Sequence, residues 1–124
     1  MKIEHHDNQN YIAVTYVGRI DESTYRSLAM KGNSLLKEYS KHLLWHFEDT
    51  VLDVNLAKLY ATQVQISGTK HPSMRNFKMA AIVSRNELDK WLFIEYVNDE
   101  LGYLRKVFLN EPHAINWLTA PTPL

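Results

Sequence analysis

Residues 11–49 read YIAVTYVGRIDESTYRSLAMKGNSLLKEYSKHLLWHFED, and this stretch decides the fold class. It begins with an apolar run through Val17 in which both alternating sets of side chains are apolar, as in a strand inside a sheet. From Asp21 to Tyr39 the apolar residues recur every three or four positions, which predicts a long helix capped by the Asp21 carboxylate. The aromatic run that starts at His42 predicts a second buried strand. A strand, a helix and a strand in this order favour a parallel β-α-β unit.

The segments on either side extend this pattern. Residues 2–6, followed by four turn formers, predict a strand that pairs with residues 11–18 as an antiparallel hairpin. The later elements alternate: a helix capped by Asp53, a strand at 77–83, a helix begun by a Ser84 to Glu87 capping box, a strand at 103–109 and a helix capped by Asn110. The predicted order is β-β-α-β-α-β-α-β-α. This order describes one α/β domain at residues 1–118 with a mixed, mostly parallel sheet, followed by a loose tail at 119–124.

Composition and charge narrow the functional classes. The chain has 124 residues, of which 45% are hydrophobic, so a core can form without metal or disulfide bonds. Its 14 basic residues balance its 14 acidic residues, which leaves no net field to attract nucleic acid. The polar N-terminal segment and the lack of a long uncharged apolar run predict a cytoplasmic protein without membrane insertion. The absence of Cys excludes thiol chemistry.

Three stretches carry a resemblance to a known family. They are residues 11–18 (YIAVTYVG) with the helix that follows, residues 43–49 (LLWHFED) running into Asp53 and Leu56, and Val107-Phe108 followed by Ala114 and Trp117-Leu118. In pattern and order they resemble the SpoIIAA-like branch of the STAS superfamily, relatives of the anti-sigma factor antagonists, and more distantly the lipid-binding Sec14-like proteins. The resemblance implies a small mixed-sheet domain that switches between protein partners or, in some branches, binds a ligand.

The resemblance also implies a phosphorylation site at the start of the second helix. The family pattern there is Asp-Ser-Ser, and this chain matches it only at Asp53, because Val54 and Asn55 carry no hydroxyl group. The nearest hydroxyl is that of Thr50. We therefore expect this protein to lack the usual phosphorylation switch.

Candidate ligand-binding residues gather where the predicted parallel strands end, because open parallel sheets bind ligands beyond those ends. They are His46, Glu48, Asp49, Thr50, Asp53, Ser84 and Arg85. His46 and Glu48 share one face of a strand and could form a ligand-binding or acid/base pair, although a hydrogen-bonded histidine at a strand end is the simpler interpretation. The predicted helix starts at Asp53 and Ser84 offer free amide groups to an anion, with Arg85 adding charge, although ordinary helix caps would give the same pattern.

The third predicted helix carries more apolar residues than one stripe requires. Its apolar residues around more than one face are Trp91, Leu92, Phe93, Ile94, Tyr96 and Val97. The candidate interface residues among them are Trp91, Phe93, Ile94 and Val97. They predict either a self-association interface in a homodimer or the wall of an apolar pocket, and cover by the final helix within one chain is the alternative.

No reaction signature accompanies these features. The sequence has no Gly-rich nucleotide loop, nucleophile elbow, EF-hand or HExxH motif, so we expect no cofactor, no metal and no enzyme activity. The leading hypothesis is a bacterial binding or regulatory domain that acts through a protein partner or a small ligand. A carrier of an apolar small molecule or lipid is the alternative, with its pocket between the third helix and the sheet. An enzyme that uses His46 with Glu48 or Asp49 is the third hypothesis.

Overall fold

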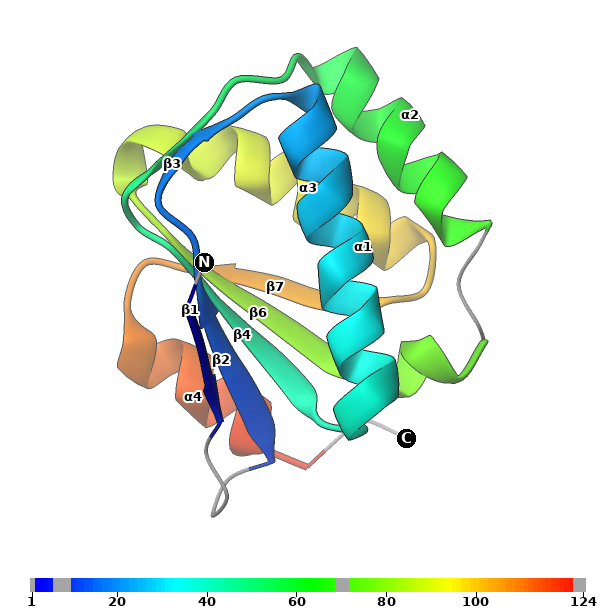
Figure 1. Cartoon of the computed structure of the whole chain (residues 1–124), viewed down its shortest axis with the longest axis vertical. Coiled ribbons are helices and arrows are strands. Elements are labelled where there is room, and N and C mark those ends of the chain that lie inside the picture. The colour runs from blue at the N-terminus through cyan, green and yellow to red at the C-terminus, as the bar shows by residue number, and fades with distance from the viewer. Residues whose placement is uncertain (1, 6–9, 69–71, 122–124) are drawn as a thin grey trace.

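A five-stranded mixed sheet forms the centre of the molecule (Figure 1). The computed structural model describes the backbone at residues 2–5, 10–68 and 72–121, and side chains at residues 10–68 and 74–121. In spatial order the strands are β1 (Lys2–His5), β2 (Tyr11–Thr15), β4 (His42–Phe47), β6 (Lys78–Val83) and β7 (Leu104–Phe108). β1 and β2 pair antiparallel, and the other neighbouring strands pair in parallel. The predicted α/β class, hairpin and mostly parallel sheet are confirmed.

Three helices lie on one face of this sheet and one helix lies on the other (Figure 1). The first group is α1 (Glu22–Tyr39), α2 (Leu56–Ser67) and α3 (Leu88–Glu100), and the fourth helix is α4 (Glu111–Thr119). Each parallel strand from β2 to β7 is added on the same side of the preceding one. Because such crossovers are right-handed, the three connecting helices must share a face. α4 follows the last strand and is free to cover the opposite face.

A second, two-stranded parallel sheet was not predicted from the sequence. It pairs β3 (Gly18–Ile20) with β5 (Thr50–Leu52). Gly18 has φ +121°, a conformation that L side chains rarely adopt, and it turns the chain from β2 into β3. Two side chains at the start of α3 hold β5 in place. The Glu87 carboxylate accepts from the Leu52 amide, and Lys90 Nζ donates to the Leu52 carbonyl at 2.9 Å. This small sheet covers the carboxyl ends of β2 and β4.

The sheet separates two hydrophobic clusters, a larger one under α1 to α3 and a smaller one under α4. The predicted apolar stripe of α1 is confirmed at Tyr25, Leu28, Gly32, Leu35 and Leu36, which are all buried. Tyr39, at the end of the same stripe, is 41% exposed. No helix in the described ranges is long and apolar enough to cross a bilayer.

Two of the four predicted helix starts are confirmed and two are wrong. Asp21 and Asn110 accept hydrogen bonds from the amides of Thr24 and His113, as N-caps do. The cap of α2 is Asn55 and not Asp53, since the Asn55 side chain accepts from the Lys58 amide at 2.8 Å.

The predicted capping box is also absent. The Ser84 side chain makes no capping hydrogen bond, and the Glu87 carboxylate is bound by Leu52 instead. A short 3-10 helix, η2 (Arg85–Glu87), follows Ser84, so α3 begins only at Leu88. A second 3-10 helix, η1 (Pro72–Asn76), lies in the predicted loop before β6. At the C-terminus, Thr119 belongs to α4 and not to the predicted tail, whose residues 122–124 lie outside the described part.

Candidate ligand-binding site

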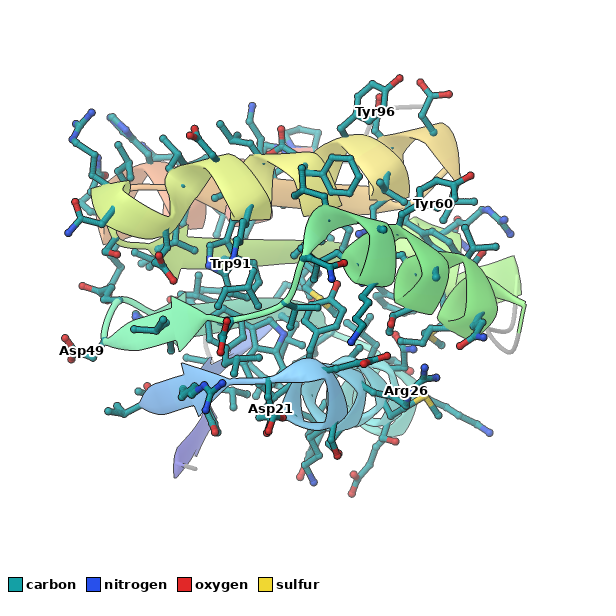
Figure 2. All side chains as sticks on the ribbon, turned by 90° about the horizontal axis from the view of Figure 1, so that it is seen from above. Asp21, Arg26, Asp49, Tyr60, Trp91 and Tyr96 are labelled. Atoms are coloured by element: carbon teal, nitrogen blue, oxygen red, sulfur yellow. The ribbon has the colours of Figure 1, made fainter. Side chains whose placement is uncertain are left out.

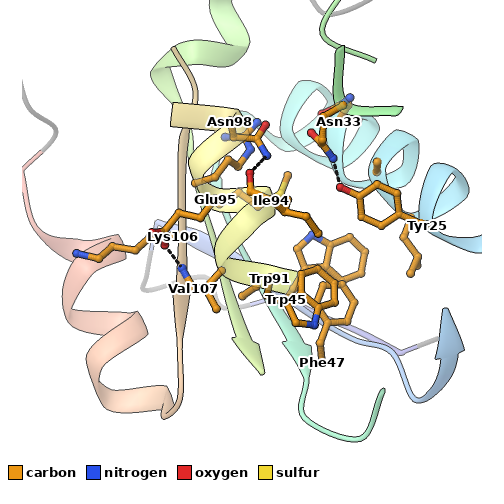
Figure 3. Close-up of a pocket in the computed structure, with 16 residues that line it drawn as sticks. Tyr25, Asn33, Trp45, Phe47, Trp91, Ile94, Glu95, Asn98, Lys106 and Val107 are labelled. Carbon is orange, nitrogen blue, oxygen red and sulfur yellow. Dashed lines mark hydrogen bonds between the residues drawn. The ribbon is translucent and has the colours of Figure 1, made fainter. Parts of the chain in front are cut away.

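A partly enclosed cavity of about 90 Å³ lies between the sheet and helices α1 and α3 (Figure 3). Its floor follows the register of the sheet, in which Trp45, Ala81 and Val107 lie side by side on β4, β6 and β7. The methyl group of Ala81 is the smallest side chain in this row, and it leaves space between two larger neighbours. Tyr25 and Leu28 of α1 and residues of α3 complete the walls.

Stacked aromatic rings form one end of this cavity, which we call the aromatic end (Figure 3). The Trp45 and Phe47 rings stack with centroids 4.8 Å apart, and the Phe47 and Trp91 rings stack with centroids 4.7 Å apart. Trp91 comes from α3 and lies in the interior between the helices and the sheet (Figure 2). Flat stacked rings give this end a large apolar surface for a ligand to cover.

Three buried polar atoms of the described residues have no hydrogen-bond partner, and all three belong to residues that line the cavity. They are Trp91 Nε1, Asn98 Oδ1 and Arg105 Nη2. Native proteins pair about 90% or more of their buried polar groups, because an unpaired one costs free energy. Their gathering around one cavity therefore indicates a site whose polar partners come from outside the chain.

Arg105 is the only one of the three that carries charge. Its Nη1 donates to the carbonyls of Phe77 and Leu104, both at 3.1 Å, and its guanidinium carbon lies 5.3 Å from the centre of the Tyr103 ring. Among the described residues no carboxylate forms an ion pair with it. Burial lowers the pKa of Arg105 to about 10, so the side chain is still a cation at neutral pH.

Other polar groups at the cavity are already paired within the chain. Gln63 Nε2 donates to the Tyr25 hydroxyl, and burial raises the pKa of this phenol, which keeps it neutral. Glu95 Oε1 accepts from the Val107 amide at 2.7 Å. These pairs hold the walls of the cavity together, whereas the three unpaired atoms lie buried in residues of those walls.

His46 and Glu48 do converge, but on the other face of the sheet. His46 Nδ1 lies 3.2 Å from Glu48 Oε1, and His46 Nε2 lies 3.7 Å from Glu111 Oε2, at the start of α4. The sequence did not indicate Glu111 as a partner. No group of three or more residues able to hold a metal ion occurs within the described ranges. The sheet separates this histidine from the cavity.

The remaining predicted residues at the strand ends do not form one site. Thr50 is buried and its hydroxyl donates to the Phe47 carbonyl at 2.6 Å. Asp53 pairs with Arg19, whose Nε donates to it at 2.9 Å. Asp49 and Arg85 are exposed, and the Ser84 side chain makes no capping hydrogen bond. These residues therefore do not gather around one anion site. The Asn55 side chain already accepts from an amide at the start of α2, and β3 pairs with β5 just before that helix.

The predicted interface residues of α3 lie mostly inside the chain. Trp91, Ile94 and Val97 are buried, and Phe93 is half-buried against the larger hydrophobic cluster. This chain's own sheet and helices cover Trp91, Ile94 and Val97, whereas Phe93 keeps part of its surface exposed. Trp91 and Ile94 line the cavity, as the alternative prediction of a pocket wall on this helix expects. The outward apolar residues of α3 are Leu92 and Tyr96, and Figure 2 shows Tyr96 at the outside of the molecule.

Sequence reasoning missed Asn98 and Arg105, although two signals were present. Asn98 follows Trp91 by seven positions, which places both side chains on the same buried face of a helix. Arg105 alternates with Tyr103 and Val107 along a strand, so it shares their inward face. A polar residue at an inward position is the pattern that would have indicated the cavity.

Comparison with solved structures identifies a similar fold. A protein of Shewanella loihica PV-4 from the DUF3478 family, described as uncharacterised and as having a SpoIIAA-like fold, matches 94% of this chain and 90% of its own, with a TM-score of 0.57 and 20% sequence identity. This chain has a SpoIIAA-like fold. The match confirms the resemblance to the SpoIIAA-like branch at the level of the fold. No protein-family model matches this SpoIIAA-like chain, and no curated protein matches it.

Proposed function

We propose that this SpoIIAA-like domain is a non-enzymatic binding domain that holds a small, largely apolar molecule in the cavity between its sheet and helices α1 and α3. The observation that carries the proposal is the position of the three unpaired buried polar atoms, which all line one cavity with an aromatic end. Ligand sites are typically apolar clefts with a few polar groups that orient the ligand. This cavity has that composition.

The size of the cavity limits the ligand. An apolar cavity of about 150 Å³ holds one benzene molecule, so a single ring would fill this partly enclosed cavity of about 90 Å³ and extend beyond its open side. A long lipid chain would require α1 and α3 to move apart. Affinity would come mainly from apolar surface removed from water, at about 25 cal/mol per Å².

A regulatory role would act through this ligand and not through a phosphate group. The helix start that carries the serines in related proteins carries Val54 and Asn55 here. The nearby Thr50 hydroxyl is buried and donates to the Phe47 carbonyl, so a kinase would reach it only after local opening. Ligand occupancy is the signal that this arrangement favours.

The test is a titration with phenylacetamide, a neutral ring compound, followed by the indole N–H signals of a two-dimensional NMR spectrum. We expect the Trp91 signal to shift, because its Nε1 is an unpaired donor on the cavity wall. Trp117 packs against Phe108 on the opposite face of the sheet, and its signal should stay in place. A spectrum in which neither cavity tryptophan, Trp45 or Trp91, responds would contradict the proposal.

Two matched substitutions locate the binding site. Ala81→Leu adds a branched side chain at the narrow point of the cavity floor and should abolish binding. Ala61→Leu makes the same chemical change at an exposed position of α2 and should leave binding unchanged. Equal binding by both variants would place the ligand outside the cavity.

A further inference from the structure

We propose that the ligand of this cavity is an anion, a carboxylic acid with an apolar body, whose carboxylate pairs with the guanidinium of Arg105. This inference rests on the proposed function and adds the charge of the ligand. Buried charges in proteins are normally paired, because an unpaired one keeps the full cost of leaving water.

Carboxylates of the chain do not provide that partner. Glu95 is the acidic residue that lines the cavity, and its Oε1 is bound to the Val107 amide at 2.7 Å. No ion pair joins Glu95, or any other described carboxylate, to Arg105. The hydrogen bonds that Arg105 does make run from Nη1 to two neutral carbonyls, and Nη2 makes none. The positive charge is therefore not neutralised within the described part of the chain.

The Tyr103 ring compensates this charge only in part. Its centre lies 5.3 Å from the guanidinium carbon of Arg105 and 4.7 Å from that of Arg75. One ring thus faces two cations, and a cation–π contact is a weak substitute for a carboxylate partner. Two guanidinium groups close to one phenol make this region of the domain electropositive. That field favours an anion over a neutral ligand.

The cavity separates its polar and apolar groups, as an apolar acid requires. Asn98 lies across the cavity from the aromatic end (Figure 3), and its backbone carbonyl oxygen accepts from the Tyr103 amide at 2.9 Å. Asn98 is thus placed beside the segment that carries Tyr103 and Arg105. A carboxylate at this end would direct the body of the ligand toward Trp45, Phe47 and Trp91.

The number of free donors favours a carboxylate over a phosphate. Arg105 offers one unpaired nitrogen and one positive charge, which match a singly charged group. A phosphate dianion would bring more charge and more acceptor oxygens than Arg105 can satisfy. The small volume of about 90 Å³ also favours the smaller group.

The experiment compares phenylacetate with phenylacetamide, which has the same shape and no charge, by isothermal titration calorimetry. We expect the wild-type protein to bind the acid at least about tenfold more tightly than the amide, as one charge-assisted hydrogen bond in a buried site allows. Arg105→Met should reduce this preference to about twofold or less, because it weakens binding of the acid more than binding of the amide. Arg85→Met, the same substitution at an exposed position, should keep the wild-type preference.

The outcomes separate this inference from the proposed function. If wild type binds acid and amide equally, or if Arg105→Met keeps the preference for the acid, the anion inference is overturned and the cavity remains a neutral site. If neither compound shifts the Trp45 and Trp91 signals or releases heat, the proposed function fails. Binding of the amide by Arg105→Met also shows that the variant is folded. Should that variant not fold, Arg105→Gln provides the same comparison with a neutral side chain that can still bond the Phe77 and Leu104 carbonyls.

Discussion

The two faces of the sheet each contain a buried cation, and the two cations differ in how completely they are hydrogen-bonded. Under α4, Lys78 Nζ donates to the carbonyls of Trp117 and Ala120 at 2.8 and 2.7 Å. Under α1 to α3, Arg105 leaves Nη2 without any partner. Both residues occupy strand positions, and both have pKa values lowered by desolvation. A buried cation is thus a structural element on one face and an unsatisfied group on the other.

The partners of Lys78 explain its structural role. It binds the last carbonyls of α4, where the helix dipole is negative and four carbonyls lack intrahelical partners. Its own amide donates to His42 Nδ1 at 2.8 Å, which holds that imidazole in its neutral form. This face is therefore complete without a ligand. The α1 to α3 face has the larger core and yet leaves three polar atoms unpaired, as the proposed binding function would require.

Truncation of a buried side chain beside the cavity should cause the greatest loss of stability, if the α1 to α3 face supports the fold. Leu28 is 8% exposed and packs in the larger cluster beside the cavity. Leu28→Ala should lower the free energy of unfolding by roughly 2 to 5 kcal/mol, as for other buried leucines. Denaturant titration measures the change.

Leu92 provides the matched control for this truncation. It lies on α3 with 40% of its surface exposed, so Leu92→Ala should change stability by about 0.5 kcal/mol or less. Similar losses for the two variants would mean that Leu28 does not contribute a buried contact of the assigned kind.

The next effect compares the two buried cations directly. Lys78→Met removes charged hydrogen bonds to two carbonyls and should destabilise the domain by about 1.5 to 3 kcal/mol. Arg105→Met also removes hydrogen bonds to two carbonyls, but it removes the unpaired Nη2 as well, so we expect a smaller loss than for Lys78→Met. Thermal unfolding of both variants without added ligand gives the comparison. A larger loss for Arg105→Met than for Lys78→Met would reverse the roles assigned to the two faces.

A smaller effect concerns pH and the α4 face. Burial, with a contribution from the Lys78 charge, lowers the pKa of His42 from its ordinary value of 6.5. The unfolded chain therefore binds more protons than the folded chain below pH 6.5, and stability should fall as the pH falls through and below this value. Asn at position 42 cannot be protonated in this range, and its side-chain oxygen can accept from the Lys78 amide. The unfolding midpoint of His42→Asn between pH 7.5 and 5 should decrease less than that of wild type, and an identical decrease would assign the pH dependence to other groups.

The smallest effect concerns His46. Its two carboxylate neighbours are more than half exposed, with side-chain exposures of 58% for Glu48 and 55% for Glu111. Such pairs contribute little in water, so Glu48→Gln should change stability by about 0.5 kcal/mol or less at neutral pH. A loss several times larger would show that the α4 face depends on this pair as well as on Lys78.

Local patterns predicted most of the secondary structure because they depend on neighbouring residues. The strand at His42–Phe47 and the helix from Asp21 follow from hydrophobic periodicity and a cap that lie within a few positions. The two wrong helix starts show the limit of such patterns. Glu87 has the right spacing for a capping box, but its carboxylate binds Leu52, which is 35 positions away in the sequence. A backbone amide that is distant in sequence and needs an acceptor can bind a side chain that would otherwise cap its own helix.

Alternation and helical periodicity record which side chains avoid water, so the α/β class, the parallel crossovers and the face that α1 buries follow from local sequence patterns. The positions of the polar residues, in contrast, depend on the tertiary structure. His46 and Glu48 lie close together, but on the face of the sheet away from the cavity. Asn98 of α3 and Arg105 of β7 line the cavity, because the apolar residues on the same face of each element are buried or partly buried. The cavity itself depends on Ala81 lying between Trp45 and Val107 in neighbouring strands. That register forms only when strands that are distant in sequence pair with each other. Burial of the unpaired Arg105 charge beside it, with its free-energy cost, has the same origin.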